Sequence, residues 1–285
     1  MLSGNSTEPT EYPEIAQVVR AVKNAHLQLS LFSNFHRGDR LLEVASLLTK
    51  DDVVRISLDA SCDATYRLVH RPGNRHAFEK VRSNIIDLLQ QRQRFRREFR
   101  VEISFVLMRH NCAHRELATL VSWARNVGVD RVRFTHLLCP KIGNEQFDNS
   151  QLLSERESTA AIAFVRNLQA EGTHSHCEIQ ILEDAPHQPQ KPFRNCHHWK
   201  LIAVLGACGR FFPCTSVSLV RLTGRLGRGD INSPSFDFWQ FWADPDKFPD
   251  LRPADCAAGR PAECIHFEFA VNQEIEQLAA ATLTG

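Results

Sequence analysis

The first 185 residues alternate between short apolar runs and longer amphipathic stretches, and this alternation limits the folds open to the chain. Repeated strand-then-helix units join parallel strands through crossover helices, because a tight turn cannot connect parallel neighbours. The expected helices are Glu14–Ala25, Asp39–Leu48, Ala77–Gln93, Ala113–Asn126 and Ser154–Gln169. The expected strands are Leu27–Phe32, Val53–Leu58, Val101–Met108, Val132–Leu138 and Ile179–Leu182. The sequence therefore predicts an α/β fold with a parallel sheet.

Several of these strands alternate apolar with polar side chains. Val54, Ile56 and Leu58 take one face of their strand, and Arg55, Ser57 and Asp59 take the other. A parallel sheet covered by helices on both sides is apolar on both faces, so a polar face needs another environment. A curved sheet or partial barrel with a polar lumen satisfies this requirement. An open two-layer sandwich whose second face meets water satisfies it as well.

Composition excludes several classes of partner and location. Lys and Arg number 34 against 33 Asp and Glu, and this balance gives no global argument for nucleic acid or a membrane surface as a partner. No run approaches eighteen apolar residues, and the first twenty residues hold Glu8, Glu11 and Glu14 instead of an apolar leader. Nine cysteines at irregular spacing, without an export signal, indicate a reducing, cytoplasmic setting in place of a disulfide framework.

One local basic run stands out from the balanced charge. Arg92, Arg94, Arg96, Arg97 and Arg100 lie at the end of an expected helix, just before a strand. Cations are favoured at a helix C-terminus by the helix dipole, so we interpret the run as a solvated helix end and not as an RNA-binding patch.

The alternation of strands and helices ends near residue 185, where three prolines interrupt both helix and strand pairing: Pro186, Pro189 and Pro192. We therefore expect one domain over residues 1–185 and a second, small α+β domain over residues 186–285. The second domain begins with a probable hairpin, Lys200–Leu205 and Arg210–Pro213. We expect the aromatic residues between Phe236 and Trp242 to pack its core.

Four cysteines of the second domain form the most specific motif: Cys196, Cys214, Cys256 and Cys264. Four thiolates brought together suit a tetrahedral zinc ion or an iron-sulfur cluster. The alternative is four separate buried thiols, which is a frequent role of cysteine. The nearby His197, His198 and His266 are substitute ligands, and Cys208 lies at the expected hairpin tip.

The same segment carries a resemblance to a known family. It reads CHHWKLIAVLGACGRFFPC, then LGRGDINSPSFDFWQFW, then CAAGRPAEC. This resembles the auxiliary-cluster domain, of the SPASM or shorter twitch type, of radical S-adenosylmethionine (radical SAM) enzymes. Gly209 and its flanking cysteines are typical, whereas the family's Cys-x-x-Cys is here Cys256 to Gly259, so one ligand is missing. The resemblance implies one auxiliary four-iron, four-sulfur (4Fe-4S) cluster on Cys196, Cys214, Cys256 and Cys264.

Residues 1–185 resemble the core barrel of the same superfamily. LSGNSTEP is similar to its GGEP-type motif, with Glu8 kept and the glycines replaced. SLFSNF resembles the Thr-Asn-Gly end of the next strand, with Asn34 in place and Phe35 where Gly is usual. The next family segments are resembled by VRISLDA, which is the closest match, and by YRLVHR, whose Arg71 matches a family Arg. The family's fifth strand is resembled by FVLMRHN, which ends at Asn111. The resemblance implies that S-adenosylmethionine is held by Glu8, Asn34, Ser57, Asp59 and Arg71.

One family motif is absent. The radical SAM core holds its catalytic cluster on a CxxxCxxC loop ahead of the GGEP-like motif, and this sequence contains no CxxxCxxC. The expected fold is therefore a partial (βα)6-type barrel lacking its first βα unit, followed by the cluster-binding domain. Either the start codon is misassigned or the protein is truncated and has lost the chemistry. Without three thiolates that leave one iron open, there is no route to reductive cleavage.

The resemblance also implies a family activity, which is cleavage of S-adenosylmethionine and hydrogen abstraction from a peptide or small metabolite. An electron-donor protein is the implied partner. The sequence as it stands is expected to bind one cluster without turnover. The competing classes are a noncatalytic iron-sulfur or scaffold protein and a zinc protein that uses the same four thiols.

Overall fold

A computed structural model gives the fold of residues 1–3, 8–137, 149–172, 175–182, 197–214, 227–248 and 271–278. Contacts divide the chain into two compact units. The described residues of the first unit lie within 1–137 and 149–182, and those of the second within 197–278. Among the described residues, no helix is both long enough and apolar enough to cross a membrane.

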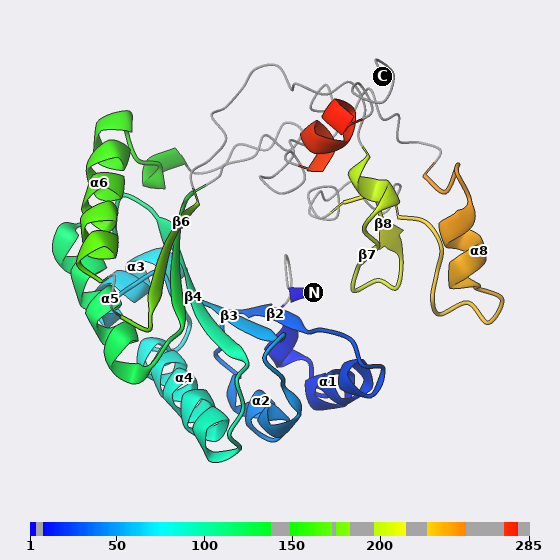
Figure 1. Cartoon of the computed structure of the whole chain (residues 1–285), viewed down its shortest axis with the longest axis horizontal. Helices are drawn as coiled ribbons and strands as arrows, with labels where there is room; N and C mark the ends of the chain where they lie inside the picture. The colour runs from blue at the N-terminus through cyan, green and yellow to red at the C-terminus, as the bar shows by residue number, and fades with distance from the viewer. Residues whose placement is uncertain are drawn as a thin grey trace. The chain divides into compact units, whose positions relative to one another are not determined.

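A six-stranded parallel sheet forms the first unit (Figure 1). The strands are β1 Leu2–Ser3, β2 Ser30–Ser33, β3 Val53–Ser57, β4 Arg100–Leu107, β5 Arg131–His136 and β6 Glu178–Leu182. Each strand pairs with the next one along the chain, as crossover helices require. Within the described residues β6 does not pair with β1, so these six strands form an open, curved sheet.

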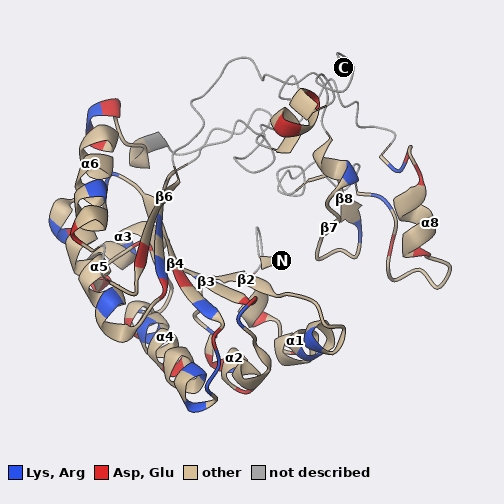
Figure 2. Ribbon diagram, in the orientation of Figure 1, with Lys and Arg blue, Asp and Glu red and all other residues tan. Residues whose placement is uncertain are grey.

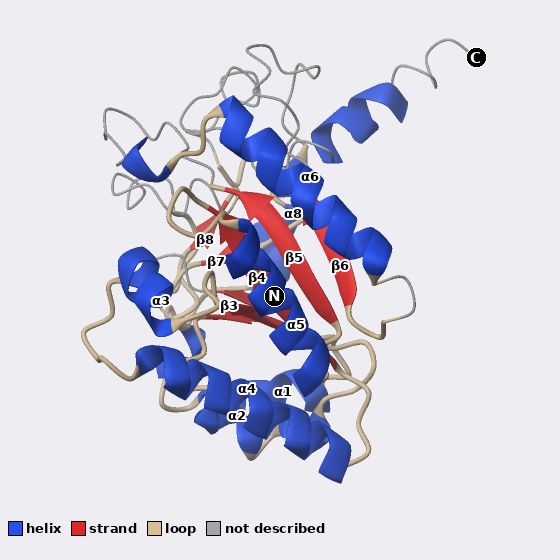
Figure 3. Ribbon diagram, turned by 90° about the vertical axis from the view of Figure 1, so that its left-hand side faces the viewer, coloured by secondary structure: helices blue, strands red, loops and turns tan. Residues whose placement is uncertain are grey.

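Six α-helices connect the strands and lie on one side of the sheet (Figures 1 and 3). They are α1 Ile15–Asn24, α2 Asp39–Leu42, α3 Asp63–His70, α4 Ala77–Arg94, α5 His114–Val127 and α6 Glu155–Glu171. Four of the five expected helices are confirmed within two residues at each end. The side chains of these helices and the outer face of the sheet build one continuous hydrophobic core.

Three sequence predictions about this unit are wrong in detail. The helix expected over Asp39–Leu48 ends at Leu42, because Val44 leaves the helical region at φ −111° and ψ 1°, and a short 3₁₀ turn follows. Helix α3 was not predicted, since Thr65 and Tyr66 are weak helix formers whose burial selects the helix. Strand β2 begins at Ser30 and not at Leu27, whose side chain is exposed.

The predicted division of the strands into an apolar and a polar face is confirmed. Val54, Ile56 and Leu58 are buried beneath the helices, and Val101, Ile103 and Phe105 of the next strand are fully buried on the same side. Charged residues occur on the strands as well as on the outer helices (Figure 2). The helices lie on one side of a curved sheet, and the polar residues line its other, inner face.

Two carboxylates, the buried Asp52 and the half-buried Asp130, hold the N-terminal ends of the strands. Asp52, directly before β3, accepts hydrogen bonds from Leu29 N at 2.7 Å and from Lys23 Nζ at 2.7 Å. Asp130, directly before β5, accepts one from Val101 N at 2.7 Å and pairs with Arg92. Each carboxylate therefore joins the start of one strand to the start of its neighbour.

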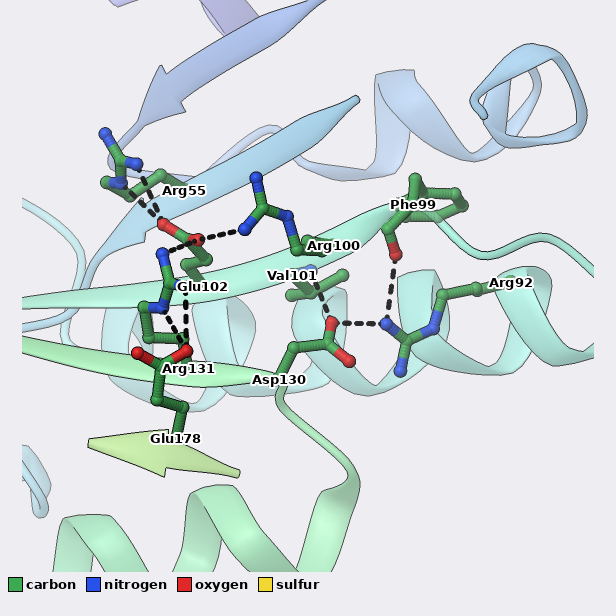
Figure 4. A network of polar contacts seen from close by, with 9 residues as sticks. All are labelled: Arg55, Arg92, Phe99, Arg100, Val101, Glu102, Asp130, Arg131 and Glu178. Atoms are coloured by element: carbon green, nitrogen blue, oxygen red, sulfur yellow. Dashed lines mark hydrogen bonds and ion pairs between the residues drawn. The ribbon is translucent and has the colours of Figure 1, made fainter. Parts of the chain in front are cut away.

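Arg92 corrects the interpretation of the basic run as a solvated helix end. Its guanidinium pairs with Asp130 and also donates to Phe99 O at 3.0 Å and to Gly128 O at 2.9 Å. Figure 4 shows this contact beside a second charged cluster. Arg92 is thus a tie between α4 and the loops before β4 and β5. The sequence showed the arginines but not their partner, which lies 38 positions further along the chain.

A row of alternating charges crosses the inner face of the sheet (Figure 4). Strand register places Arg55, Glu102, Arg131 and Glu178 side by side on four neighbouring strands. The Glu102 side chain is fully buried and accepts from Arg55 Nη2 at 2.8 Å and from Arg131 Nη1 at 2.9 Å. Arg131 also reaches Glu178 at 2.7 Å. Opposite charges facing each other across strands stabilise this register.

The second unit has a small aromatic core. A hairpin joins β7 Val204–Leu205 to β8 Phe211–Phe212, and its turn contains Gly209 at φ +77°. The expected hairpin is confirmed in its central part, whereas its first strand begins at Val204 and not at Lys200, which ends a 3₁₀ turn. Helix α8, Phe238–Ala243, and the preceding Phe236 pack against the hairpin, as predicted for the aromatic segment. Residues 271–278 form a further helix.

Replacing Glu102 with Gln should destabilise the first unit by about 3 kcal/mol, because Arg55 and Arg131 lose the buried anion they share. Urea unfolding measures the loss. The control is Glu178→Gln, at the exposed end of the row, which should cost less than about 1 kcal/mol. Equal losses in the two variants would show that burial of Glu102 is not what makes the row stabilising.

Candidate functional site at the C-terminal ends of the strands

The Glu8 carboxylate lies at the C-terminal end of β2. Its Oε1 atom accepts from Ser33 Oγ at 2.6 Å and from Thr10 N at 3.0 Å, while its Oε2 accepts from Asn34 N at 2.7 Å. Ligands of parallel α/β folds bind at this end of the sheet. The structure therefore brings together Glu8 and Asn34, two of the residues expected to hold a cofactor.

The turn after β2 has a backbone conformation that normally needs glycine. Phe35 has φ +62°, in the left-handed region, although its ring is fully buried. Asn84 Nδ2 donates to Phe35 O at 2.8 Å and holds the turn. Phe35 is at the position where the resembled family usually has Gly, a residue that adopts a positive φ at little cost. The cost of the conformation, about 1–2 kcal/mol for a side chain with a Cβ atom, is offset here by burial of a phenyl ring.

Asp59 extends the pairing of β3 with β4 beyond the end of β3. Its backbone is also left-handed, at φ +51°, and its Oδ1 atom accepts from Val106 N at 2.6 Å, where a strand carbonyl would otherwise accept. The buried Asn111 donates to Asp59 O at 2.9 Å and to Val106 O at 2.8 Å. Asp59 and Asn111 together fix the backbone at the C-terminal ends of β3 and β4.

A line of titratable side chains runs from Asp59 back to the turn after β2. His70 Nε2 lies 3.3 Å from Asp59 Oδ2, and the His70 ring packs on Tyr66 with 4.4 Å between centroids. The Tyr66 hydroxyl and His36 Nε2 are 2.6 Å apart. Burial, with a smaller contribution from Asp59, raises the pKa of Tyr66 well above 10, so it stays a neutral phenol. Sequence reasoning missed this line, since its members come from three separate segments.

Burial is also the main cause that lowers the pKa of His36 from its ordinary value of 6.5. Repulsion from His70 acts in the same direction, and the carboxylates of Glu8 and Glu11 oppose it. The neutral form of His36 is therefore favoured in the folded protein, where it can share a hydrogen bond with Tyr66.

The remaining predicted cofactor residues are less closely grouped. Ser57 is the last residue of β3, half-buried on the inner face two positions before Asp59. Arg71 ends α3 in a left-handed conformation, at φ +45°, and its side chain is exposed. In the part of the chain that the structure describes, Arg71 makes no hydrogen bond or ion pair with Glu8, Asn34, Ser57 or Asp59.

One of the four predicted metal ligands lies within the described residues. Cys214 follows β8 and is buried in the second unit. Cys196, Cys256 and Cys264 lie outside the described residues, and so does the substitute ligand His266. Among the residues that are described, no group of three or more His, Cys, Asp or Glu could hold a metal ion. The predicted quartet therefore stays a prediction.

Solved structures match the chain, although no protein-family profile matches it and no curated protein is similar to it. SuiB from Streptococcus suis superposes with a TM-score of 0.58 at 12% identity, over 85% of this chain and 54% of SuiB. SuiB bound to S-adenosylmethionine gives a TM-score of 0.57 at 12% identity, over 86% and 55% of the two chains. SuiB bound to its precursor peptide SuiA gives 0.53 at 11% identity, over 85% and 53%.

At identities this low, the similarity shows a common fold. The chain spans about half the length of SuiB. The observed fold agrees with the partial βα barrel that the radical SAM resemblance implies. The cluster-binding domain stays a prediction.

Acidification from pH 7 to pH 5 should destabilise the first unit, with His36 as one cause. A histidine whose folded pKa lies below its unfolded value of 6.5 binds more protons when unfolded, so its contribution falls as the pH drops through that value. Urea unfolding at several pH values should give a shallower pH dependence for His36→Gln than for the wild type. The exposed His110 offers the control His110→Gln, which should keep the wild-type slope. An unchanged slope in His36→Gln would contradict this assignment.

Proposed function

We propose that the first unit binds S-adenosylmethionine at the C-terminal ends of β1 to β3, and that the second unit carries an iron-sulfur cluster. The observation that carries the first part is the Glu8 carboxylate, which gathers Ser33 and the backbone of Asn34 at that end of the sheet. The same fold in SuiB, a protein crystallised with S-adenosylmethionine, supports it.

The residues present fit an S-adenosylmethionine molecule. Asn34 and Ser57 offer an amide and a hydroxyl, both half-buried, to the polar groups of the ligand. Glu8 adds a negative charge next to Asn34, which favours the ammonium and sulfonium groups of this ligand. When bound, the ligand supplies an electrophilic sulfonium centre. Glu8 and Asn34 orient it, while Asp59 and Asn111 keep the ends of β3 and β4 in register.

The residues present do not fit the catalytic cluster of the family. The sequence has no CxxxCxxC, and the described residues contain no group of three or more potential metal ligands. Reductive cleavage requires an iron atom with an open position, held by three thiolates. The chain's own residues therefore provide no route to a radical, and we propose binding without turnover for these 285 residues.

The cluster proposed for the second unit uses Cys196, Cys214, Cys256 and Cys264, as the family resemblance implies. A peptide or small metabolite is the proposed substrate class of an active relative, with an electron-donor protein as its partner. The second candidate is a zinc site on the same thiols, since the described member Cys214 is a buried thiol after a hairpin and suits either metal centre. In that case the chain is a noncatalytic zinc protein on a degenerate barrel.

Isothermal titration with S-adenosylmethionine tests the first part. The wild type should bind saturably, and Asn34→Ala should bind about five- to tenfold more weakly, because one polar contact is typically worth about 1–1.5 kcal/mol. The control Asn126→Ala changes an exposed residue of α5 and should bind like the wild type. Absence of saturable binding, or equal affinity in Asn34→Ala, would overturn the proposed site.

Metal analysis after anaerobic purification and reconstitution tests the second part. About four irons and four sulfides per chain, lost in Cys214→Ala, are expected for the cluster. Cys62→Ala, at an exposed thiol of the first unit, is the control and should keep the full metal content. One zinc and no sulfide in the wild type would replace the cluster with the zinc site.

A further inference from the structure

Arg133 lies on the inner face of the sheet, two residues after Arg131 along β5. It therefore belongs to the next row of side chains toward the C-terminal ends of the strands, beside the charged row that contains Glu102. It is the third residue of β5, and strand register places it between Ser104 of β4 and Gln180 of β6. Ser57 of β3 continues the same row on the other side of Ser104. All three flanking side chains are neutral hydrogen-bonding groups.

The guanidinium of Arg133 has no counter-ion within the described residues. Its Nε atom is buried and makes no hydrogen bond. Glu102, the carboxylate that acts on Arg133 electrostatically, is already shared, because its Oε2 accepts from Arg55 and its Oε1 from Arg131. An arginine stays protonated in proteins, so this charge is present without a partner of its own.

The charges of the inner face do not balance. Strands β3 to β6 contribute the four cations Arg55, Arg100, Arg131 and Arg133 to this face, against the two anions Glu102 and Glu178. Burial lowers the pKa of Arg133, and the charges of Arg55 and Arg131 act in the same direction, partly opposed by Glu102. An added negative charge at this place would therefore be stabilised by cations that already lie there.

We propose that Arg133 is the centre of an oxyanion-binding site on the inner face of the sheet, which receives a carboxylate or phosphate group of a ligand. The flat guanidinium can hold such a group through two parallel hydrogen bonds. The Ser104 hydroxyl and the Gln180 amide, on either side, can donate to the same oxygens. The site uses Arg133, Ser104 and Gln180, whereas the S-adenosylmethionine proposal rests on Glu8 and Asn34; Ser57, which that proposal also uses, lies in the same row of the sheet.

Thermal unfolding at constant ionic strength tests the site, with chloride replaced by inorganic phosphate in one series and by succinate in another. The wild type should gain Tm saturably with at least one probe, because a ligand that binds only the folded state stabilises it. Arg133→Gln should lose this gain. Since the substitution removes an unpaired, partly buried charge, the variant should also have a higher Tm than the wild type in chloride.

Two further variants separate a specific site from general ion effects. Arg133→Lys should keep part of the gain, because a lysine supplies the charge without the two-pronged geometry. Arg109→Gln changes an exposed arginine and should respond to both probes like the wild type. A larger gain with phosphate assigns the site to phosphorylated ligands, and a larger gain with succinate assigns it to carboxylates. Equal gains in the wild type and Arg133→Gln, or no gain with either probe, would overturn the proposal.

Discussion

The buried carboxylate of Glu102 is the interaction on which the inner face of the sheet depends. It lies in the middle of four strands and neutralises arginines from both neighbouring strands, at 2.8 and 2.9 Å. A parallel sheet that presents arginines to its own inner side requires such an anion, because like charges in a partly dry environment repel strongly. Glu102 is occupied by Arg55 and Arg131 and does not pair with Arg133. Arg133 therefore differs from an ordinary surface arginine, because its Nε atom is buried without a hydrogen bond.

The two ends of the sheet have different tasks. At the N-terminal ends of the strands, Asp52 and Asp130 accept backbone N–H groups of the neighbouring strand and resemble each other in position and partners. At the C-terminal ends, Glu8 and Asp59 also accept backbone N–H groups, but beside half-buried polar residues such as Asn34 and Ser57. Carboxylates thus hold both ends; at the N-terminal end they pair with Lys23 and Arg92, whereas at the C-terminal end they lie beside the neutral polar residues Asn34 and Ser57.

Sequence periodicity was sufficient for the layers of the first unit. The alternation around Ile56 and Ser57 identified the buried and the inner face, since both depend only on the two-residue repeat of a strand. The family resemblance named Glu8 and Asn34, whose contact the structure contains. Periodicity could not reveal pairs such as Arg92 with Asp130 or His36 with Tyr66, because nothing in one sequence relates positions 38 or 30 residues apart. Helix α3 was missed for a local reason, as tertiary burial of Tyr66 outweighs weak propensity.

The strand order has a consequence for how the chain can acquire its fold during synthesis. Every strand of the sheet pairs with its immediate predecessor along the chain, from β1 through β6. A strand leaving the ribosome therefore finds its partner already made, and no later segment has to insert between two paired strands. Folding can advance from one βα unit to the next, each closing over a single crossover segment. The same order lets evolution add or remove a unit at either edge of the sheet without rethreading the others.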